Sequence, residues 1–387
     1  MRRLLFLACA VVFLDVTFFA VLTPLLPSYR EELGIGEAAA GVLSGAFAAG
    51  TLVMALPAGW MAARWGSRRT VIIGLVGIGI FSPLFGFADS LVLLDVSRFL
   101  QGASGAMMWA GSISWVVSAA PRERRGEVIG TVIAAAVVGE LFGAPLGALA
   151  HEIGTEFVFG TVFFLAAALI AVAMTIPPSS EMEGQPIRQA VQAIYGSNVQ
   201  RAVLMLAAPS LAFGLVVVVA PLHMDDLGAS PILIAAAFAA GALIEAIVGP
   251  LIGRYSDRAG RIAPFLIGLA VLGVAVIAIG FFDSLPLIVI AVILVAFGAG
   301  LAFTPASTLV TDFATAAGLN QGYASGASNV AWGGGQMVGA VGGGLLASAT
   351  GYLIPCLVTA GVLALVATVT RGIDAQPLAN VAERKSE

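Results

Sequence analysis

Apolar segments of about 20 residues recur along this chain of 387 residues and constrain its fold more than any other feature. Each is long enough to cross the hydrocarbon core of a bilayer as a helix. Hydrophobic residues make up 59% of the chain and charged residues 10%, a balance that soluble globular domains do not have. The segments do not alternate between apolar and polar residues, which excludes the strands of a transmembrane barrel. The sequence therefore predicts an all-α polytopic membrane protein.

The first apolar segment follows Arg2 and Arg3 and imitates a signal peptide. It is too long for one, contains Asp15 and lacks a clear small-residue cleavage site, so we predict an uncleaved helix that ends at Pro24 and Pro27. Twelve transmembrane helices are predicted in all. They cover about 4–27, 38–62, 70–88, 91–118, 126–150, 156–177, 201–224, 231–253, 262–282, 286–311, 321–349 and 352–370.

A more polar segment divides the predicted helices into two groups of six. We expect an N-terminal six-helix bundle at 1–177, a cytoplasmic linker with a short surface helix at 178–200, a C-terminal six-helix bundle at 201–371 and a cytoplasmic tail at 372–387. Cys9 and Cys356 both lie in apolar segments and are expected to be free, buried thiols.

Charge segregates between the two sides of this twelve-helix arrangement. One side holds Arg2, Arg3, Arg64, Arg68, Arg69, Arg122, Arg124, Arg125, Arg188, Arg254, Arg258, Arg261, Arg371, Arg384 and Lys385. The other side holds Arg30 with Glu31, Glu32, Glu37, Asp89, Glu152, Glu156, Asp225, Asp226 and Asp283. The positive-inside rule then predicts that both termini lie in the cytoplasm, for a protein of the bacterial inner membrane.

Glycine spacing relates the two groups of helices. The first copy is Gly130, Gly139, Gly143 and Gly147, and the second is Gly326, Gly335, Gly339 and Gly343. Glycines four residues apart form a stripe on a helix, which another helix backbone can approach closely. Gln336 stands in the second copy where Glu140 stands in the first, and Pro221 follows Pro27 by 194 residues. We infer two related halves, with a substrate site near the midplane between them.

Several motifs on these helices resemble those of the major facilitator superfamily, specifically its twelve-helix drug:proton antiporters, and the resemblance covers nearly the whole chain. The motif of the family's cytoplasmic loops is similar to Gly59, Gly66, Arg68 and Arg69 in the first half and to Gly253, Asp257, Arg258, Gly260 and Arg261 in the second. The motif of helix 4 resembles Arg98, Gln101, Gly102 and Gly105. The helix 5 motif of exporters resembles Gly130, Gly139, Gly143, Pro145 and Gly147.

The chain also departs from the family pattern. Ala63 stands where the first loop of the family has an aspartate that helps to latch the cytoplasmic ends of the halves, so the second loop, with Asp257, is expected to carry more of the latch. Glu140 adds a charge to a helix that is mostly small and apolar in the family.

Four charged residues inside the predicted spans are candidates for function, because a charge there is costly unless it lines a cavity or has a partner. Asp15, Glu140 and Glu245 are expected to bind protons or a cationic substrate, and the alternative is a structural hydrogen bond to a neighbouring helix. Arg98 could tune a carboxylate or hold an anionic substrate. The alternative for Arg98 is a pair with Asp95 that snorkels to the surface.

Aromatic and amide side chains on the same helices are candidates for the cavity wall, because rings attract cations and an amide is costly against lipid. They are Phe18, Phe19, Trp109, Phe213, Phe238, Asn329, Trp332 and Gln336. His151 and His223 lie at helix ends and are expected to be solvated.

These features predict a proton-coupled exporter of small lipophilic, cationic compounds that works by alternating access. Its expected partners are protons, a small-molecule substrate and the bilayer, and the chain is expected to act as a monomer. An uptake symporter or exporter for a sugar, organic acid or other metabolite is the first alternative, and a non-transporting sensor is the second. The sequence has no Ser/His/Asp set, His/Cys metal cluster or phosphate-cradling loop with a lysine, so no enzymatic activity, cofactor, metal or nucleic-acid partner is expected.

Overall fold

The structure is a computed structural model that describes residues 1–121, 124–178 and 186–371. Within these ranges the chain forms fourteen helices and no strand. The helices are α1 (Arg2–Ala20), α2 (Leu22–Leu33), α3 (Glu37–Arg64), α4 (Ser67–Gly86), α5 (Leu91–Ala119), α6 (Arg125–Ile153), α7 (Thr155–Thr175), α8 (Ile187–Ile194), α9 (Ser197–Asp226), α10 (Pro231–Ala259), α11 (Ile262–Phe281), α12 (Leu285–Ala316), α13 (Gln321–Thr350) and α14 (Leu353–Thr370).

Thirteen of the helices form twelve membrane spans when α1 and α2 are taken as one span and the short α8 is left aside. Ten spans in the described ranges are long and apolar enough to cross by length and composition alone. The remaining two, α5 and α13, have 29 and 30 residues, which is also long enough. Their glycines and polar side chains lower their hydropathy, and both helices are largely buried inside the protein.

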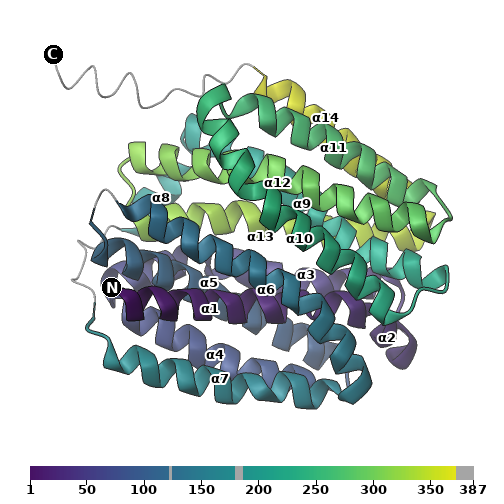
Figure 1. Ribbon diagram of the computed structural model, residues 1–387, viewed down its shortest axis with the longest axis horizontal. Coiled ribbons are helices and arrows are strands. Elements are labelled where there is room, and N and C mark those ends of the chain that lie inside the picture. Colours follow the sequence, from purple (N-terminus) through teal and green to yellow (C-terminus); the bar gives the residue numbers. More distant parts are fainter. Residues whose placement is uncertain (122–123, 179–185, 372–387) are drawn as a thin grey trace.

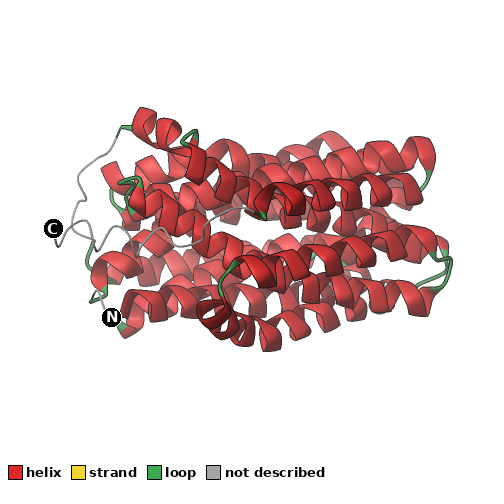
Figure 2. Cartoon of the chain, turned by 90° about the horizontal axis from the view of Figure 1, so that it is seen from above, coloured by secondary structure: helices red, strands yellow, loops and turns green. Residues whose placement is uncertain are grey.

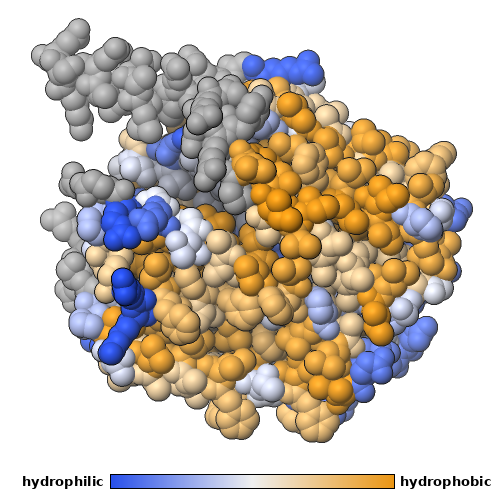
Figure 3. All heavy atoms as spheres, viewed as in Figure 1, coloured by the Kyte–Doolittle hydropathy of each residue, from blue (hydrophilic) through white to orange (hydrophobic). Residues whose placement is uncertain are grey.

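The spans form two pseudo-symmetric six-helix bundles, with α1 to α7 in the first and α9 to α14 in the second (Figure 1). Figure 2 shows the helices running along the long axis with the connecting loops at both ends. Apolar side chains cover most of the face seen in Figure 3, and polar ones gather toward its two ends. We call the end that carries the N-terminus and α8 the arginine-rich end, and the opposite end, with Glu37, Asp226 and Asp283, the acidic end.

The first span is longer than predicted and is interrupted rather than ended by proline. Helix α1 stops at Ala20 and α2 continues from Leu22 to Leu33, with Pro27 inside it. The ring of Pro24 meets the carbonyl of the residue four positions earlier, which is Ala20, and removes the hydrogen bond that this carbonyl would accept. The chain can resume a helix after this break because proline is tolerated in a first helical turn.

Glycine stripes hold each bundle together through close backbone contact. A Cβ added to Gly139 or Gly143 of α6 would lie 2.8 Å from the carbonyl oxygen of Phe13 or 2.6 Å from that of Thr17 in α1. The second half repeats these contacts between α13 and α9. There, a Cβ on Gly335 would lie 2.3 Å from the carbonyl oxygen of Ala207, and one on Gly339 would lie 2.0 Å from that of Leu211.

These repeated contacts support an internal duplication, because Ala207 and Leu211 each follow their counterparts Phe13 and Thr17 by 194 residues. Turn glycines repeat at the same interval. Gly34 and Gly228 have φ angles of 61° and 83°, and Gly66 and Gly260 have φ angles of 87° and 86°. Such positive angles favour glycine, so the two halves share both their turns and their helix packing.

The two bundles meet most closely along α3 and α13. A Cβ on Gly41 would lie 2.6 Å from the carbonyl oxygen of Ala340, near the acidic end. A Cβ on Gly59 would lie 2.7 Å from the carbonyl oxygen of Gly322, near the arginine-rich end. The pair of helices is therefore in backbone contact over most of its length, and the space between the bundles is closed in this conformation.

Substitution of Gly102 tests this packing. A methyl group on Gly102 of α5 would lie 1.8 Å from the carbonyl oxygen of Phe47 in α3, a backbone atom that cannot move aside as a side chain can. Gly102→Ala should destabilise the protein by about 1–3 kcal/mol or more, the usual cost of overpacking, and lower its thermal unfolding midpoint in detergent.

Gly130 provides the matched control because an added Cβ there would meet no atom within 4 Å. Gly130→Ala should keep or raise the midpoint, since alanine is favoured over glycine in a helix by about 1 kcal/mol. A Gly102→Ala protein as stable as the original would contradict the packing described here.

Candidate functional site

Arg98 lies inside the first bundle, with 1% of its surface exposed. Its Nη1 donates to the carbonyl oxygen of Phe18 at 3.0 Å and to Oε1 of Gln101 at 2.9 Å, and its Nη2 donates to the carbonyl oxygen of Phe19 at 3.0 Å. The last carbonyls of a helix lack partners within it and carry its partial negative charge, and α1 ends at Ala20. The break in the first span thus creates the acceptors that hold a buried cation.

This arrangement corrects one expectation for Arg98. A snorkelling pair with Asp95 was an alternative, but the guanidinium instead points to α1 and lies 5.0 Å from the ring centroid of Phe47. Phe47 and Phe85 flank it with their rings, which favours a cation in a dry site. The sequence offered no signal for this contact, because the interruption of the helix at Val21 could not be located from the apolar pattern.

Asp15 lies one turn before these carbonyls and is also buried, with 3% exposed. Trp109 Nε1 donates to its Oδ2 at 3.0 Å, while Oδ1 has no hydrogen-bond partner among the described residues. A Cβ on Gly105 would lie 2.5 Å from Oδ1, so the last glycine of the helix 4 motif makes room for this carboxylate. Arg98 acts on Asp15 through its charge.

A narrow pocket lies between the two bundles and has Glu140 in its wall. Residues from both halves line it: Phe19, Ala20, Thr23, Glu140, Ala144, Phe213, Val217 and Phe238. Its volume is about 10 Å³, which is room for about one water molecule. Four of these residues were candidates from the sequence, namely Phe19, Glu140, Phe213 and Phe238. The others are small or aliphatic apart from Thr23, and nothing in the sequence distinguishes them from packing residues.

Glu140 and Glu245 come from different halves and meet at the seam between them. Helices α6 and α10 pack against each other, and the two carboxylates, each half-buried, are close enough for their charges to interact. The Cγ of Glu245 also lies 3.5 Å from the position that a Cβ on Gly300 of α12 would take. The absence of a side chain at Gly300 therefore leaves space beside this glutamate.

The remaining cavity candidates have different surroundings. Phe18 is turned away from the pocket and packs edge-on against Phe159, with 5.5 Å between ring centroids. The ring of Trp332 packs on that of Phe19, also at 5.5 Å. Gln336 is fully buried and neither of its amide atoms has a partner among the described residues. Asn329 is half-buried, and its Nδ2 likewise has no partner in the described part of the chain.

The loop motifs connect helices at the arginine-rich end. Arg68 donates to the carbonyl oxygen of Ile176 at 3.3 Å, which ties the start of α4 to the end of α7. Arg261 forms an ion pair with Asp312 and so ties α11 to α12. Ala63 is buried, and Arg69 is exposed. The surroundings of Gly253 and the side chains of Asp257 and Arg258 lie outside the described part, as do residues Arg122, Arg384 and Lys385.

An ion-pair cluster joins the two halves at the acidic end. Arg30, near the end of α2, pairs with Asp226 at the end of α9 and lies 3.5 Å from a carboxylate oxygen of Asp225. The hydroxyl of Tyr352, which precedes α14, donates to Asp226. Burial raises the pKa of Tyr352, and the hydrogen bond to Asp226 raises it further, so Tyr352 keeps its proton and remains a donor.

His223 extends this cluster and differs from expectation. Its ring stacks on that of Tyr352 with 4.7 Å between centroids, and its Nδ1 lies 2.8 Å from the carbonyl oxygen of Ile279. The prediction that His223 is solvated is therefore wrong, because the last turn of α9 faces α11 and α14. His151 is exposed as expected and lies 2.9 Å from the hydroxyl of Ser28.

Similar proteins include transporters from fungi and bacteria. The chain is 34% identical over 169 residues to MFS-type transporter ppzB of Metarhizium rileyi, a match that covers 42% of this chain and 34% of that protein. It is 27% identical over 167 residues to Multidrug resistance protein 1 of Bacillus subtilis, covering 43% of each. The matched stretch thus spans less than half of either relative.

Solved structures share the fold over almost the full length. The human organic anion transporter MFSD10 (TETRAN) superposes with a TM-score of 0.75 at 18% identity, covering 96% of this chain and 99% of that one. The family model of the Major Facilitator Superfamily matches residues 6–318 and 202–386. With the twelve spans, the two bundles and nearly the whole length of the chain in agreement, this transporter belongs to the Major Facilitator Superfamily.

Proposed function

We propose that this transporter is a proton-coupled exporter of small lipophilic, cationic compounds. The observation that carries the proposal is the pocket between the bundles, which combines the carboxylate of Glu140 with the rings of Phe19, Phe213 and Phe238. A carboxylate attracts a cation by its charge, and aromatic faces add cation–π attraction for ammonium groups with apolar substituents. The name of the Bacillus subtilis relative, a multidrug resistance protein, supports the same class of substrate.

The proposed orientation has both termini and the arginine-rich end in the cytoplasm of a bacterial inner membrane. It rests on the segregation of arginines to that end, since positively charged loops are retained in the cytoplasm. The proposed units are the bundles 1–177 and 201–371, joined by a cytoplasmic linker at 178–200, with a tail at 372–387. The chain is proposed to act as a monomer without enzymatic activity, because each chain contains both halves of the site.

Alternating access follows from how the two ends are closed. At the acidic end, Arg30 and Asp226 join the halves by a partly exposed ion pair. At the arginine-rich end, the backbones of Gly59 and Gly322 are in contact. Rocking of the bundles would separate one of these contacts while the other holds, and the pocket would widen toward the open end. The small volume of the pocket matches a closed intermediate of this cycle.

Proton coupling is assigned to three carboxylates in two places. Glu140 and Glu245 repel each other when both are ionised, so closure of the seam favours a proton or a substrate cation between them. Asp15 has one oxygen without a partner among the described residues, which leaves it able to accept a proton. Arg98 positions this region because its Nη1 and Nη2 bind the end of α1, while its buried Nε has no partner among the described residues.

Replacement of the seam glutamates tests the coupling. Glu140→Gln or Glu245→Gln keeps the shape of the side chain but removes its charge, and should reduce pH-driven transport at least tenfold. The measurement is accumulation of a lipophilic fluorescent cation in inside-out vesicles with an imposed pH gradient, compared with and without an uncoupler. Tenfold corresponds to about 1.4 kcal/mol, well within what loss of a charge at a half-buried site costs.

Glu127 lies on the same helix as Glu140 but is exposed and pairs with Arg124 at the surface. Glu127→Gln should leave transport unchanged, because exposed ion pairs contribute little. Full, uncoupler-sensitive transport in both seam variants would refute the assignment. Accumulation of a neutral or anionic solute in place of the cation would favour the alternative of a metabolite transporter.

The Arg30 cluster makes a separate prediction. Arg30→Ala should favour opening at the acidic end and speed the reaction of Thr23→Cys, a pocket position, with a membrane-impermeant thiol reagent added at that end. The labelling rate should rise about fivefold, because a partly exposed ion pair contributes about 1 kcal/mol. Cys9 and Cys356 are replaced by serine in the background. In the control variant Arg30→Lys, which keeps the charge, the cysteine should be labelled more slowly than in Arg30→Ala. Equal labelling rates in Arg30→Ala and the parent would contradict the role of the cluster.

A further inference from the structure

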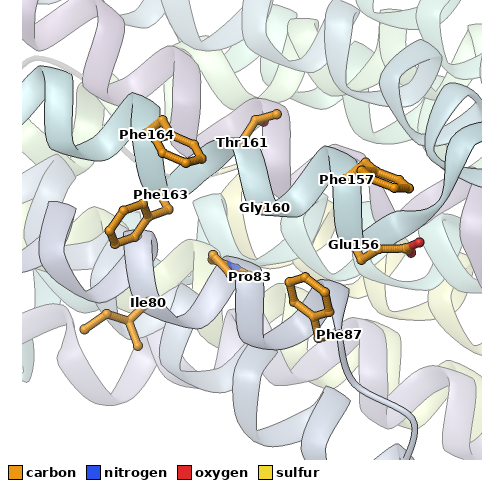
Figure 4. A pocket seen from close by; sticks show the side chains of 10 residues that line it. Ile80, Pro83, Phe87, Glu156, Phe157, Gly160, Thr161, Phe163 and Phe164 are labelled. Carbon is orange, nitrogen blue, oxygen red and sulfur yellow. The ribbon is translucent and has the colours of Figure 1, made fainter.

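A groove of about 580 Å³ runs between α4 and α7 of the first bundle (Figure 4), and none of the residues that line it lines the pocket between the bundles. Its walls are formed by the rings of Phe87, Phe157, Phe163 and Phe164. These side chains are 53% to 73% exposed, so they border an open channel instead of filling it. The groove therefore faces the surroundings of the protein rather than its interior.

The groove has a definite direction in the membrane. Helix α4 ends at Gly86 and α7 begins at Thr155, both at the acidic end of the protein. The groove begins there, at Phe87 and Glu156, and extends inward as far as Phe164. Eight residues of helix separate Glu156 from Phe164, which is about 12 Å along the helix axis. It thus leads from the level of the lipid headgroups into the hydrocarbon core.

A glycine gives the groove its open floor. A Cβ added to Gly160 would meet no atom within 4 Å, so the space above this residue is empty. The phenyl rings beside it provide apolar contact on several sides, which a flexible hydrocarbon chain can fill. In a bilayer the molecule at this depth is an acyl chain, because the groove is on the face that the membrane surrounds.

The rim of the groove carries the carboxylate of Glu156, which lies over Gly154 at the start of α7. Glu156 is half-buried in the first turn of α7, where the helix dipole favours a carboxylate, and Figure 4 shows it beside Phe87 and Phe157. A carboxylate accepts hydrogen bonds from an ammonium group, and aromatic faces attract the same cation. An anionic headgroup would be repelled at this position.

We propose that this groove binds one phospholipid whose headgroup carries a primary ammonium, with an acyl chain between α4 and α7 and the ammonium at Glu156. This binding site is separate from transport, since it shares no residue with the pocket at the seam. Lipid retention and proton-coupled transport can therefore be measured separately on one preparation, and loss of one does not imply loss of the other.

The test is native mass spectrometry of the purified full chain in detergent, with palmitoyl-oleoyl phosphatidylethanolamine or the phosphatidylglycerol of the same chains added at equal concentration. The protein should retain about three times more phosphatidylethanolamine, the effect expected for one partly exposed charge contact. Glu156→Gln should remove this preference. Glu152→Gln, an exposed carboxylate nearby that does not line the groove, should keep it.

A second variant tests the location of the acyl chain. An added Cβ at Gly160 meets no atom within 4 Å, so Gly160→Leu should fill the floor and reduce retention of phosphatidylethanolamine to the level of phosphatidylglycerol. Gly361→Leu is the control, because an added side chain on α14 also meets no atom within 4 Å. The proposal is overturned if Glu156→Gln keeps the preference, if Gly160→Leu retains as much lipid as the parent, or if Gly361→Leu loses as much as Gly160→Leu.

Discussion

Close contact between helix backbones is the constraint on which the rest of this structure depends. Apolar side chains gain little by leaving lipid for the protein interior, so membrane helices associate through tight packing. Glycines meet this need by removing side chains wherever two backbones touch, as at Gly143 against Thr17 and Gly339 against Leu211. Because the helices pack so closely, few places in the protein interior have room for a large side chain. The candidate site residues occupy the gaps that remain. Asp15, for example, is accommodated because position 105 is glycine.

The interruption of the first span is the second structural device, and it explains a buried cation. An arginine cannot be buried without acceptors for its donors, and an intact helix offers none because its carbonyls are already bonded. Termination of α1 at Ala20 frees the carbonyls of Phe18 and Phe19, and Arg98 binds both. A single break thus fixes Arg98 beside Asp15 and turns Phe19 toward the pocket at the seam.

The sequence predicted the twelve membrane spans and the packing of the glycine stripes, because these depend on apolar length and on residue spacing along one helix. The sequence predicted less about side-chain contacts between helices, because these depend on which residues the neighbouring helix places opposite. Nothing in the chain indicates that Arg98 binds carbonyls instead of Asp95, that Phe18 turns toward Phe159, or that His223 stacks on Tyr352. These are contacts between residues 79 to 141 positions apart, set by how helices rotate against each other. The sequence could not identify Ala20, Ala144 and Val217 as part of the pocket wall for a different reason. Alanine and valine also fill the packed interfaces between helices, so their type does not distinguish the two locations.

The charged residues break the symmetry that the backbone keeps. At the interval of 194 residues, Asp15 corresponds to Pro209 and Glu245 to Thr51, whose hydroxyl is bonded to the carbonyl oxygens of Phe47 and Gly102. Glu140 corresponds in the glycine repeat to Gln336. Each carboxylate therefore has an uncharged counterpart at the equivalent position of the other half. The fold itself does not require the charge. Two of the three still meet, because Glu140 and Glu245 belong to different halves that face each other at one seam. The two halves share their backbone packing, but each of these carboxylates occurs in one half without a charged counterpart in the other.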